Sequence, residues 1–361
     1  MTIQGLHHIT LVCADAQRTV NFYVNVLGLR FVKRTVNFDD PGSYHLYFGD
    51  EAGRPSTAIT FFEWPGAPKG HWGIGGTHHF ALAVNDYDGL LKWKRRLTDL
   101  GLKVDGPLDR HYFESIYFTD PDGAILEIAT MGPGWTIDEA ADQIGTEFRA
   151  PPAEMLVNNR DEAPLRVVAA TWPEPVPVIT ADMALSQGMH HITAIGSDIQ
   201  RTHAFFGDLL EMRRVKMTNN FDDPKSAHWY WGVGDGRPGT LITYFERDPA
   251  KERRMRMGSG QTHHYAFAVS GEATQLEWRE KLVRASLRVS PVMDRVYFKS
   301  IYTNDPDGHI VELATAGPGF ASDEPVAELG QSLKLPAWLE SHRIEIESVL
   351  RPLNVPEWQK P

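Results

Sequence analysis

The chain is poor in cysteine and has no long apolar run. Its single cysteine, Cys13, excludes an internal disulfide and is typical of proteins from a reducing compartment. Because Cys13 ends the apolar run 9–13, we expect it to pack in the core rather than to act as a nucleophile. No stretch approaches the roughly 18 apolar residues that a membrane span needs. The first residues show no secretory signal. We therefore expect a cytoplasmic protein with no membrane partner.

Basic charge is also scarce. Lys and Arg number 36 against 47 Asp and Glu, which gives a net charge of −11. An acidic chain gains no counterion release on nucleic acid, so we expect no nucleic-acid partner. The longest basic cluster, residues 251–256, is typical of a solvated loop, with the rim of a site for an acidic substrate as the alternative. Hydrophobic residues reach 42%, enough to bury a core.

What the sequence does contain is an internal duplication of about half its length. GLHHITLVCA at 5–14 recurs as GMHHITAIGS at 188–197, and THHFALAV at 77–84 recurs as THHYAFAV at 262–269. The offset is 183 near the start and 185 later. A proline-rich stretch lies between the copies and suits an extended linker. We predict a first domain over 1–150, a linker over 151–187 and a second domain over 188–361.

Each half divides again into two units. Every unit opens with a His-His pair on a strand, continues with a helix and then has about three short strands. Asp15 can cap the first helix, which Gly28 ends. The second helix has an apolar face made of Leu90, Trp93, Leu97 and Leu100. Four βαβββ modules in two tandem halves predict an α+β fold, with curved mixed sheets backed by helices.

Strand alternation separates the two histidines of each pair. In residues 78–84, His79 shares a face with Ala81 and Ala83, whereas His78 lies with bulkier side chains. Small neighbours leave open space in which a metal and a substrate fit. A packed core histidine is the alternative for any single pair, but four pairs at equivalent places favour function. The second histidines are therefore predicted to face cavities: His8, His79, His191 and His264.

A carboxylate recurs with these histidines. Glu127 follows His79 by 48 residues, and Glu312 follows His264 by the same 48. An acid within an apolar strand is costly to bury unless it is paired or metal-bound, and an exposed edge strand is the alternative. Two imidazoles and one carboxylate form the facial triad of non-haem Fe(II) enzymes. An arginine and a tyrosine precede each glutamate by 17 and 10 residues: Arg110 and Tyr117, and Arg295 and Tyr302.

The residues leave two pairings of the modules open. Pairing in order joins His8 with His79 and Glu127, and His191 with His264 and Glu312. Crosswise pairing joins His8 with His264 and Glu312, and His191 with His79 and Glu127.

These motifs resemble the vicinal-oxygen-chelate superfamily, which includes glyoxalase I and extradiol dioxygenases. Within it, GLHHITL, FVKRTVNFDDPGSYHLYFGDEAGRPST, DRVYFKSIY and VELAT look like the hydroquinone-type ring-cleaving dioxygenases. The resemblance covers 5–352 and implies half-barrels around metal cavities. It implies crosswise pairing, with Fe(II) held by His8, His264 and Glu312. It further implies catalytic roles for the residues around that metal: His7, Thr10, His263, Arg295 and Tyr302. The chain departs from the family in also keeping a second candidate metal site, formed by His79, Glu127 and His191.

The resemblance implies an Fe(II)-dependent extradiol-type dioxygenase that cleaves a hydroquinone or catechol-like aromatic with dioxygen. Mn(II), Ni(II) and Zn(II) are the alternative metals, and a homodimer is left open. A glyoxalase-like isomerase or lyase is the competing function. It would need a fourth ligand, for which Glu63 and Glu246 are candidates. A metal-free binding module is the third class, but it would have no reason to keep the His and Glu sets.

Overall fold

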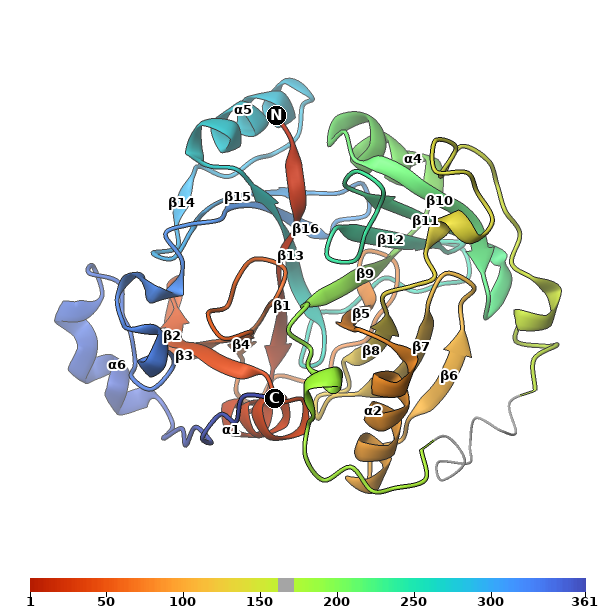
Figure 1. The fold of residues 1–361 in the computed structure, drawn as a ribbon. Coiled ribbons are helices and arrows are strands. Elements are labelled where there is room, and N and C mark those ends of the chain that lie inside the picture. Colours follow the sequence, from red (N-terminus) through yellow and green to blue (C-terminus); the bar gives the residue numbers. More distant parts are fainter. Residues whose placement is uncertain (162–171) are drawn as a thin grey trace.

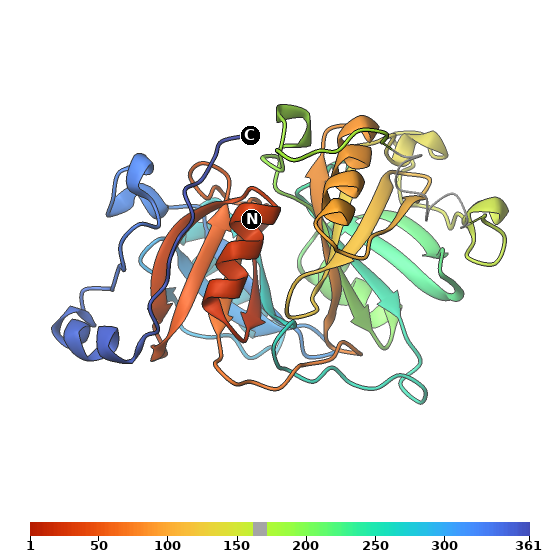
Figure 2. The ribbon, with the colours of Figure 1, turned by 90° about the horizontal axis from the view of Figure 1, so that it is seen from below.

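Two eight-stranded curved sheets lie side by side in the computed structural model, which describes residues 1–161 and 172–361 (Figures 1 and 2). Each sheet curls into a half-barrel, and helices pack on its outer face. The predicted α+β fold of four modules is confirmed. The domain boundaries stay a prediction, and residues 162–171 of the predicted linker lie outside the described residues.

The four modules repeat one order of elements. The first contains β1 (Ile3–Cys13), α1 (Ala16–Asn21), β2 (Arg30–Asn37), β3 (Asp40–Gly49) and β4 (Ala58–Glu63). The second contains β5 (Thr77–Val84), α2 (Tyr87–Asp99), β6 (Asp105–Asp109), β7 (Glu114–Thr119) and β8 (Ile125–Thr130). The third contains β9 (Met189–Gly196), α4 (Ile199–His203), β10 (Arg213–Asn220), β11 (Asp223–Gly232) and β12 (Leu241–Glu246). The fourth contains β13 (Thr262–Val269), α5 (Glu272–Arg284), β14 (Met293–Asp294), β15 (Lys299–Asn304) and β16 (Ile310–Thr315). A last helix, α6 (Arg343–Val349), follows.

The modules pair crosswise. One sheet has the order β14-β15-β16-β13-β1-β4-β3-β2 and so joins the fourth module to the first. The other has the order β10-β11-β12-β9-β5-β8-β7-β6 and joins the third to the second. The two modules of each sheet meet at one antiparallel strand pair, which we call the seam: β1–β13 in the first sheet and β5–β9 in the second. In Figure 2 one sheet carries the strands from both ends of the chain and the other the strands from its middle.

The helices begin and end largely as their sequences predict. The Asp15 side chain accepts a hydrogen bond from the Arg18 backbone N–H at 2.8 Å, which caps α1. A π-helical turn over Phe22–Val26 then extends α1 towards Gly28, which the regular periodicity did not predict. The expectation for Leu100 was wrong. Leu100 follows the end of α2 and is half exposed, so Leu90, Trp93 and Leu97 form the buried face.

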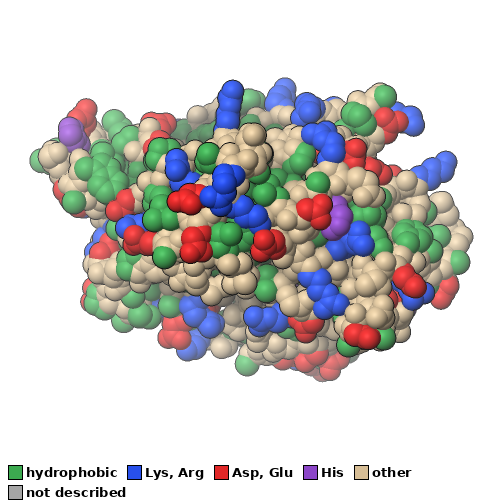
Figure 3. All heavy atoms as spheres, turned by 90° about the horizontal axis from the view of Figure 1, so that it is seen from above, with side chains coloured by type: hydrophobic (Ala, Val, Ile, Leu, Met, Phe, Trp, Pro, Cys, Tyr) green, Lys and Arg blue, Asp and Glu red, His purple; other side chains and the backbone are tan. Residues whose placement is uncertain are grey.

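Two connecting segments cross between the sheets and pair with each other. Residues 64–76 lead from β4 to β5, and residues 247–261 lead from β12 to β13. Bridges join Lys69 to Ser259, His71 to Arg256 and Ile74 to Arg254. The basic cluster 251–256 therefore lies in a segment that connects the two sheets. On the face drawn in Figure 3, blue and red side chains are intermixed.

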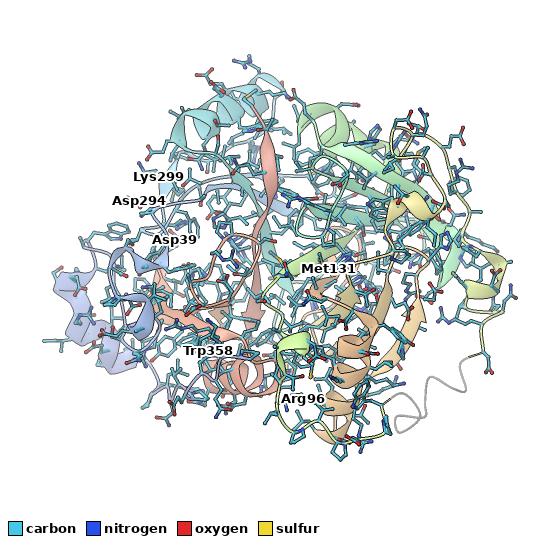
Figure 4. All side chains as sticks on the ribbon, in the orientation of Figure 1. Asp39, Arg96, Met131, Asp294, Lys299 and Trp358 are labelled. Atoms are coloured by element: carbon cyan, nitrogen blue, oxygen red, sulfur yellow. The ribbon has the colours of Figure 1, made fainter. Side chains whose placement is uncertain are left out.

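The linker is attached to the second module through Arg96. This residue of α2, labelled in Figure 4, donates hydrogen bonds to the carbonyls of Pro177 at 2.6 Å and Asn25 at 2.9 Å. One guanidinium thus fixes the linker, α2 and the end of the first helix together. Cys13 is fully buried, as predicted. Within the described ranges, no helix is long and apolar enough to cross a membrane.

A buried lysine joins the two modules of each half-barrel. Lys216 of β10 donates to Asp138 Oδ1 and Glu139 Oε2, each at 2.6 Å, and lies over the Tyr112 ring. Asp138 and Glu139 follow β8, so these bonds tie the tail of one module to the edge strand of its partner. Lys33 makes the equivalent bonds to Asp323 and Glu324 in the other sheet. The repeated segment after GPG therefore ends in an acidic pair that receives a lysine.

We predict that Lys216→Met lowers the free energy of unfolding by about 3–5 kcal/mol, because two carboxylates lose their buried partner. Urea unfolding followed by fluorescence measures this. Lys251→Met is the matched control, because Lys251 pairs with Asp248 at the surface, and its effect should stay below about 1 kcal/mol. Equal effects of the two substitutions would contradict a stabilising role for the buried Lys216 ion pairs.

Candidate metal centres

The strand register places the predicted residues side by side on one face of each sheet. In the first sheet His8 lies opposite Ala266, Ala266 opposite Glu312, and Glu312 opposite Tyr302. A single row across four strands thus carries a histidine, an alanine, a glutamate and a tyrosine. The alanine methyl leaves room above the row. His264 lies two residues before Ala266 on β13, so its side chain projects from the same face of the sheet into that room.

Three ligand atoms converge in this first cluster. His8 Nε2 lies 3.2 Å from His264 Nε2, and Glu312 Oε2 lies 3.3 Å from the first and 3.0 Å from the second. All three residues are buried. Ser300 Oγ donates a short hydrogen bond to Glu312 Oε1, which orients the carboxylate.

The second cluster repeats the first in the other sheet. The equivalent row carries His191, Ala81, Glu127 and Tyr117. His79 Nε2 lies 2.9 Å from Glu127 Oε2 and 3.3 Å from His191 Nε2, and Ser115 donates to Glu127 Oε1. Both clusters draw on two modules in the crosswise combination. The in-order combination brings none of its predicted trios together among the residues that the structure describes.

The first histidine of the N-terminal pair sets the tautomer of the second. Burial, together with the neighbouring His8, lowers the pKa of His7 to about 3, so His7 is neutral near pH 7. Its Nε2 lies 3.1 Å from the Thr315 carbonyl, which can only accept, and therefore carries the proton. Its Nδ1 must then accept from His8 Nδ1 at 2.9 Å. When His8 binds a metal, its proton is thus held on Nδ1, and its Nε2 faces the cluster as a ligand atom.

The same reasoning applies to the third pair. Burial, with His191 beside it, lowers the pKa of His190 to about 3, and His190 bonds the Thr130 backbone. His190 Nδ1 lies 2.9 Å from His191 Nδ1. His191 Nε2 therefore also faces its cluster as a ligand atom, with the Nδ1 proton held by His190.

Each glutamate has one oxygen that, among the described residues, contacts only the imidazole nitrogens of its cluster. Burial alone would raise the pKa of Glu312, but the adjacent His8 and His264 hold that pKa well below its usual range. Its Oε2 nevertheless accepts no well-aligned hydrogen bond within the described part of the chain, and the same is true of Glu127 Oε2. An ionised oxygen buried without a donor is costly. Two nitrogen lone pairs and one such oxygen fit a divalent transition metal.

A cavity of about 410 Å³ opens beside the first cluster. Arg295 Nε donates to the Tyr302 hydroxyl at 3.1 Å, and Arg295 also pairs with Asp39 at the rim, which Figure 4 labels. Aromatic rings form much of the wall: Phe38, Tyr47, Phe62 and Phe298. A cavity of about 760 Å³ opens beside the second cluster and repeats this arrangement with Arg110, Tyr117 and Asp222. Both volumes lie in the range of small-molecule sites.

The other predicted residues surround the first cluster. Thr10 Oγ1 lies 3.0 Å from His264 Nε2 and 2.7 Å from Thr60 Oγ1. His263 Nδ1 lies 2.8 Å from His264 Nδ1. Burial, together with His264, lowers the pKa of His263 to about 3. His263 and Thr10 therefore both contact a cluster histidine.

The structure adds residues that sequence reasoning missed. Ser115 and Ser300 hold the glutamates, and Tyr47 and Thr60 each bond one ring nitrogen of His45. All of them recur in both halves at the duplication offset, so the repeat itself was the signal that could have found them.

The candidate fourth ligands lie elsewhere. Glu63 Oε1 accepts from the Ala16 backbone N–H at 2.9 Å, and Glu246 Oε1 accepts from Ile199 N–H at the same distance. Strand parity explains this. Thr60 and Phe62 face the cavity, so Glu63 faces the helix. Neither glutamate belongs to a three-residue cluster in the described residues.

In metal-free protein at pH 7, we expect His8 and His191 to carry their proton on Nδ1. Long-range ¹⁵N–¹H spectra distinguish the two tautomers by the nitrogen shifts. His342 is exposed at the surface and should give the common Nε2–H form as an internal control. An unprotonated His8 Nδ1 would contradict the geometry described above.

Comparison with known proteins agrees with this arrangement. The family described as "Glyoxalase/Bleomycin resistance protein/Dioxygenase superfamily" matches residues 5–128 and 188–313. The chain is 31% identical to "Putative ring-cleaving dioxygenase MhqO" of Bacillus subtilis (strain 168), covering 98% of this chain and 97% of that protein. It is 27% identical to "Chlorohydroquinone/hydroquinone 1,2-dioxygenase" of Sphingobium indicum, with 98% and 97% covered.

A solved structure extends the likeness to three dimensions. The crystal structure of a "putative dioxygenase from Bacillus subtilis subsp. subtilis str. 168" superposes with a TM-score of 0.78 at 31% identity, covering 99% of both chains. The family match spans well over half of the chain, in the two copies that the duplication defines. The chain belongs to the glyoxalase/bleomycin resistance protein/dioxygenase superfamily.

Proposed function

We propose that this protein is an Fe(II)-dependent extradiol-type dioxygenase that cleaves the ring of a hydroquinone or catechol-like aromatic. The observation that carries the proposal is the buried cluster of two histidines and one glutamate at the base of each cavity. Its unsatisfied carboxylate oxygen and the two imidazole nitrogens that converge on it suit a metal ion. The ring-cleaving names of full-length relatives support the reaction class.

His8, His264 and Glu312 would hold one iron, and His79, His191 and Glu127 a second. Three protein ligands leave coordination positions open, so the metal would bring the substrate oxygen and dioxygen next to each other and pass electrons between them. The protein side chains would orient the metal ligands, bind the substrate and exclude water.

His7 and Ser300 hold the ligands in place. Both ring nitrogens of His7 are engaged, with Thr315 and His8, so His7 orients His8 rather than touching a substrate. Ser300 fixes the second oxygen of Glu312. Such outer contacts set the direction and basicity of metal ligands.

Tyr302 is placed to bind the substrate oxygen. Burial raises the pKa of Tyr302, so the phenol keeps its proton near neutral pH. Because Arg295 donates to the phenol oxygen, the hydroxyl proton remains available for an acceptor in the cavity. Tyr302 lies edge-on to His264, with ring centroids 5.8 Å apart. The phenol would thus donate to an oxygen on the ring that is being cleaved, while the aromatic wall holds the ring and excludes water.

The glyoxalase-like alternative is less well supported. It requires a fourth protein ligand, and both candidate glutamates are engaged at helix N-termini on the opposite face of the sheets. Oxygen consumption separates the two functions, because the isomerase or lyase needs none.

We predict that anaerobically loaded protein binds close to two irons per chain and consumes oxygen with a hydroquinone or catechol, whereas zinc-loaded protein does not. Glu312→Gln and Glu127→Gln each remove the charge that balances one metal, and each should leave about one iron. Metal analysis and an oxygen electrode measure the two effects. Glu63→Gln is the matched control, since Glu63 is a buried strand glutamate outside both clusters, and should keep both irons.

Double variants test the pairing. His8→Ala with Glu312→Gln damages one cluster and should leave one iron, whereas His8→Ala with Glu127→Gln damages both. Full turnover by zinc- or nickel-loaded protein without oxygen would refute the dioxygenase. Saturation of the wild-type protein at one iron would refute the second site.

Tyr302→Phe should lower turnover at the first site by about a hundredfold or more, because the phenol proton is lost at the substrate oxygen. Oxygen uptake is measured in a Glu127→Gln background, where the first site alone is loaded. Iron content should stay unchanged, which separates substrate contact from metal binding. Tyr44→Phe, on the outer face of the same sheet, is the control. Unchanged turnover in Tyr302→Phe would remove Tyr302 from the reaction.

A further inference from the structure

The two cavities differ in charge beside otherwise equivalent clusters. Trp64 follows β4, and Arg247 stands at the same place after β12, at the duplication offset of 183. Trp64 lies edge-on to His263, with centroids 6.1 Å apart, whereas Arg247 lines the larger cavity. Arg160, from the segment after β8, also lines the larger cavity, whereas among the described residues the segment after β16 adds no basic residue to the smaller one.

Arg247 lies on the aromatic wall next to the second cluster. Its guanidinium carbon is 5.6 Å from the centroid of Phe245. The Phe245 ring contacts the His78 ring at 5.3 Å and the His79 ring at 6.3 Å between centroids. Arg247 therefore packs on a ring that itself contacts a cluster histidine, on the wall of the same cavity.

The guanidinium of Arg247 keeps donors for a ligand. Within the described chain its side chain donates one hydrogen bond, from Nη1 to Asp223 Oδ2 at 2.7 Å. A guanidinium has five N–H groups in a planar fork that matches a carboxylate. Asp223 is 48% exposed, so water screens much of its charge, whereas the Arg247 side chain is only 19% exposed.

In the described part of the chain, the smaller cavity has no second arginine at the position of Arg247. Its basic lining residue is Arg295, whose donors are directed to Tyr302 and Asp39. Phe62 and Phe298 line it, with Trp64 behind His263. A carboxylate that entered there would lie against these rings and would compete with Tyr302 and Asp39 for Arg295, which makes its burial costly.

We propose that the larger cavity binds an aromatic ring carrying an anionic substituent such as a carboxylate, held by Arg247, and that the smaller cavity selects an uncharged ring. This rests on the proposed function, in which a ring hydroxyl lies at each metal. Duplication has then given one chain two sites of the same chemistry and different substrate charge.

The test compares 2,5-dihydroxybenzoate, a hydroquinone with a carboxylate, with methylhydroquinone, which is uncharged. Binding to iron-loaded protein is measured by calorimetry without oxygen, so no turnover occurs. Glu312→Gln isolates the larger cavity and Glu127→Gln the smaller one. The larger cavity should bind the carboxylated ring at least about tenfold more tightly than the methylated one, and the smaller cavity should reverse the order.

Arg247→Gln in the Glu312→Gln background should weaken binding of 2,5-dihydroxybenzoate by about tenfold and change methylhydroquinone binding by less than about twofold. Arg237→Gln, at the surface beyond the cavity, should change neither. Equal affinity for both probes in the larger cavity would overturn the proposal. Equal weakening of both probes by Arg247→Gln would also overturn it, since Arg247 would then only shape the wall.

The outcomes separate this inference from the proposed function. The inference stands or falls on the ratio of two affinities measured without oxygen. The proposed function stands or falls on iron content and oxygen uptake of the same samples. If the two cavities distinguish the two probes as expected but the samples consume no oxygen, only the ring-cleavage proposal is refuted.

Discussion

An ionised glutamate buried at the middle of each sheet is the constraint on which the rest of the structure depends. Glu127 and Glu312 are completely buried, and such a group is tolerated only when its surroundings compensate the charge. A serine hydroxyl satisfies one oxygen, and two imidazoles flank the other. The alanine beside each glutamate in the register leaves the space in which these groups meet. The cavity, the row of residues and the orienting histidines all follow from that requirement.

The crosswise pairing makes each cluster depend on both halves of the chain. Each seam joins a strand of one half to a strand of the other, and each cluster takes ligand atoms from both. The connecting segments pair with each other as they cross, and the buried lysines tie each tail to the partner module. A change in one half therefore reaches the site of the other through the shared sheet, although the sequence repeats as two tandem copies.

Much of this arrangement could be predicted from local sequence. Alternation along a strand identified the second histidine of each pair, and the common spacing of 48 residues identified Glu127 and Glu312. Local patterns carry no information on which strand edges meet, because seams between distant segments depend on the complete fold. The combination of ligands therefore needed the family resemblance.

Other details were not predicted from the sequence, for different physical reasons. The π-turn after α1 does not follow the regular helical period, and Leu100 lies past the last turn of α2, where its apolar side chain stays in solvent. Glu63 was a candidate fourth ligand for the competing function, although its alternation with Thr60 and Phe62 places it under the helix. The acidic pair after GPG was visible as a repeat, but its lysine partner comes from a strand far along the chain.

The nested order of the modules has a consequence for how the chain is made. The sheet of the second and third modules is complete once residue 246 has been synthesised, whereas the other sheet needs both its first strand and β16, which ends at Thr315. β1 must therefore wait, with an unpaired apolar edge, while most of the protein emerges behind it. Pairings of such long sequence separation form slowly and expose strand edges in the meantime. We therefore expect the half-barrel of the second and third modules to fold first. The half-barrel of the first and fourth modules is completed afterwards, when β1 pairs with β13.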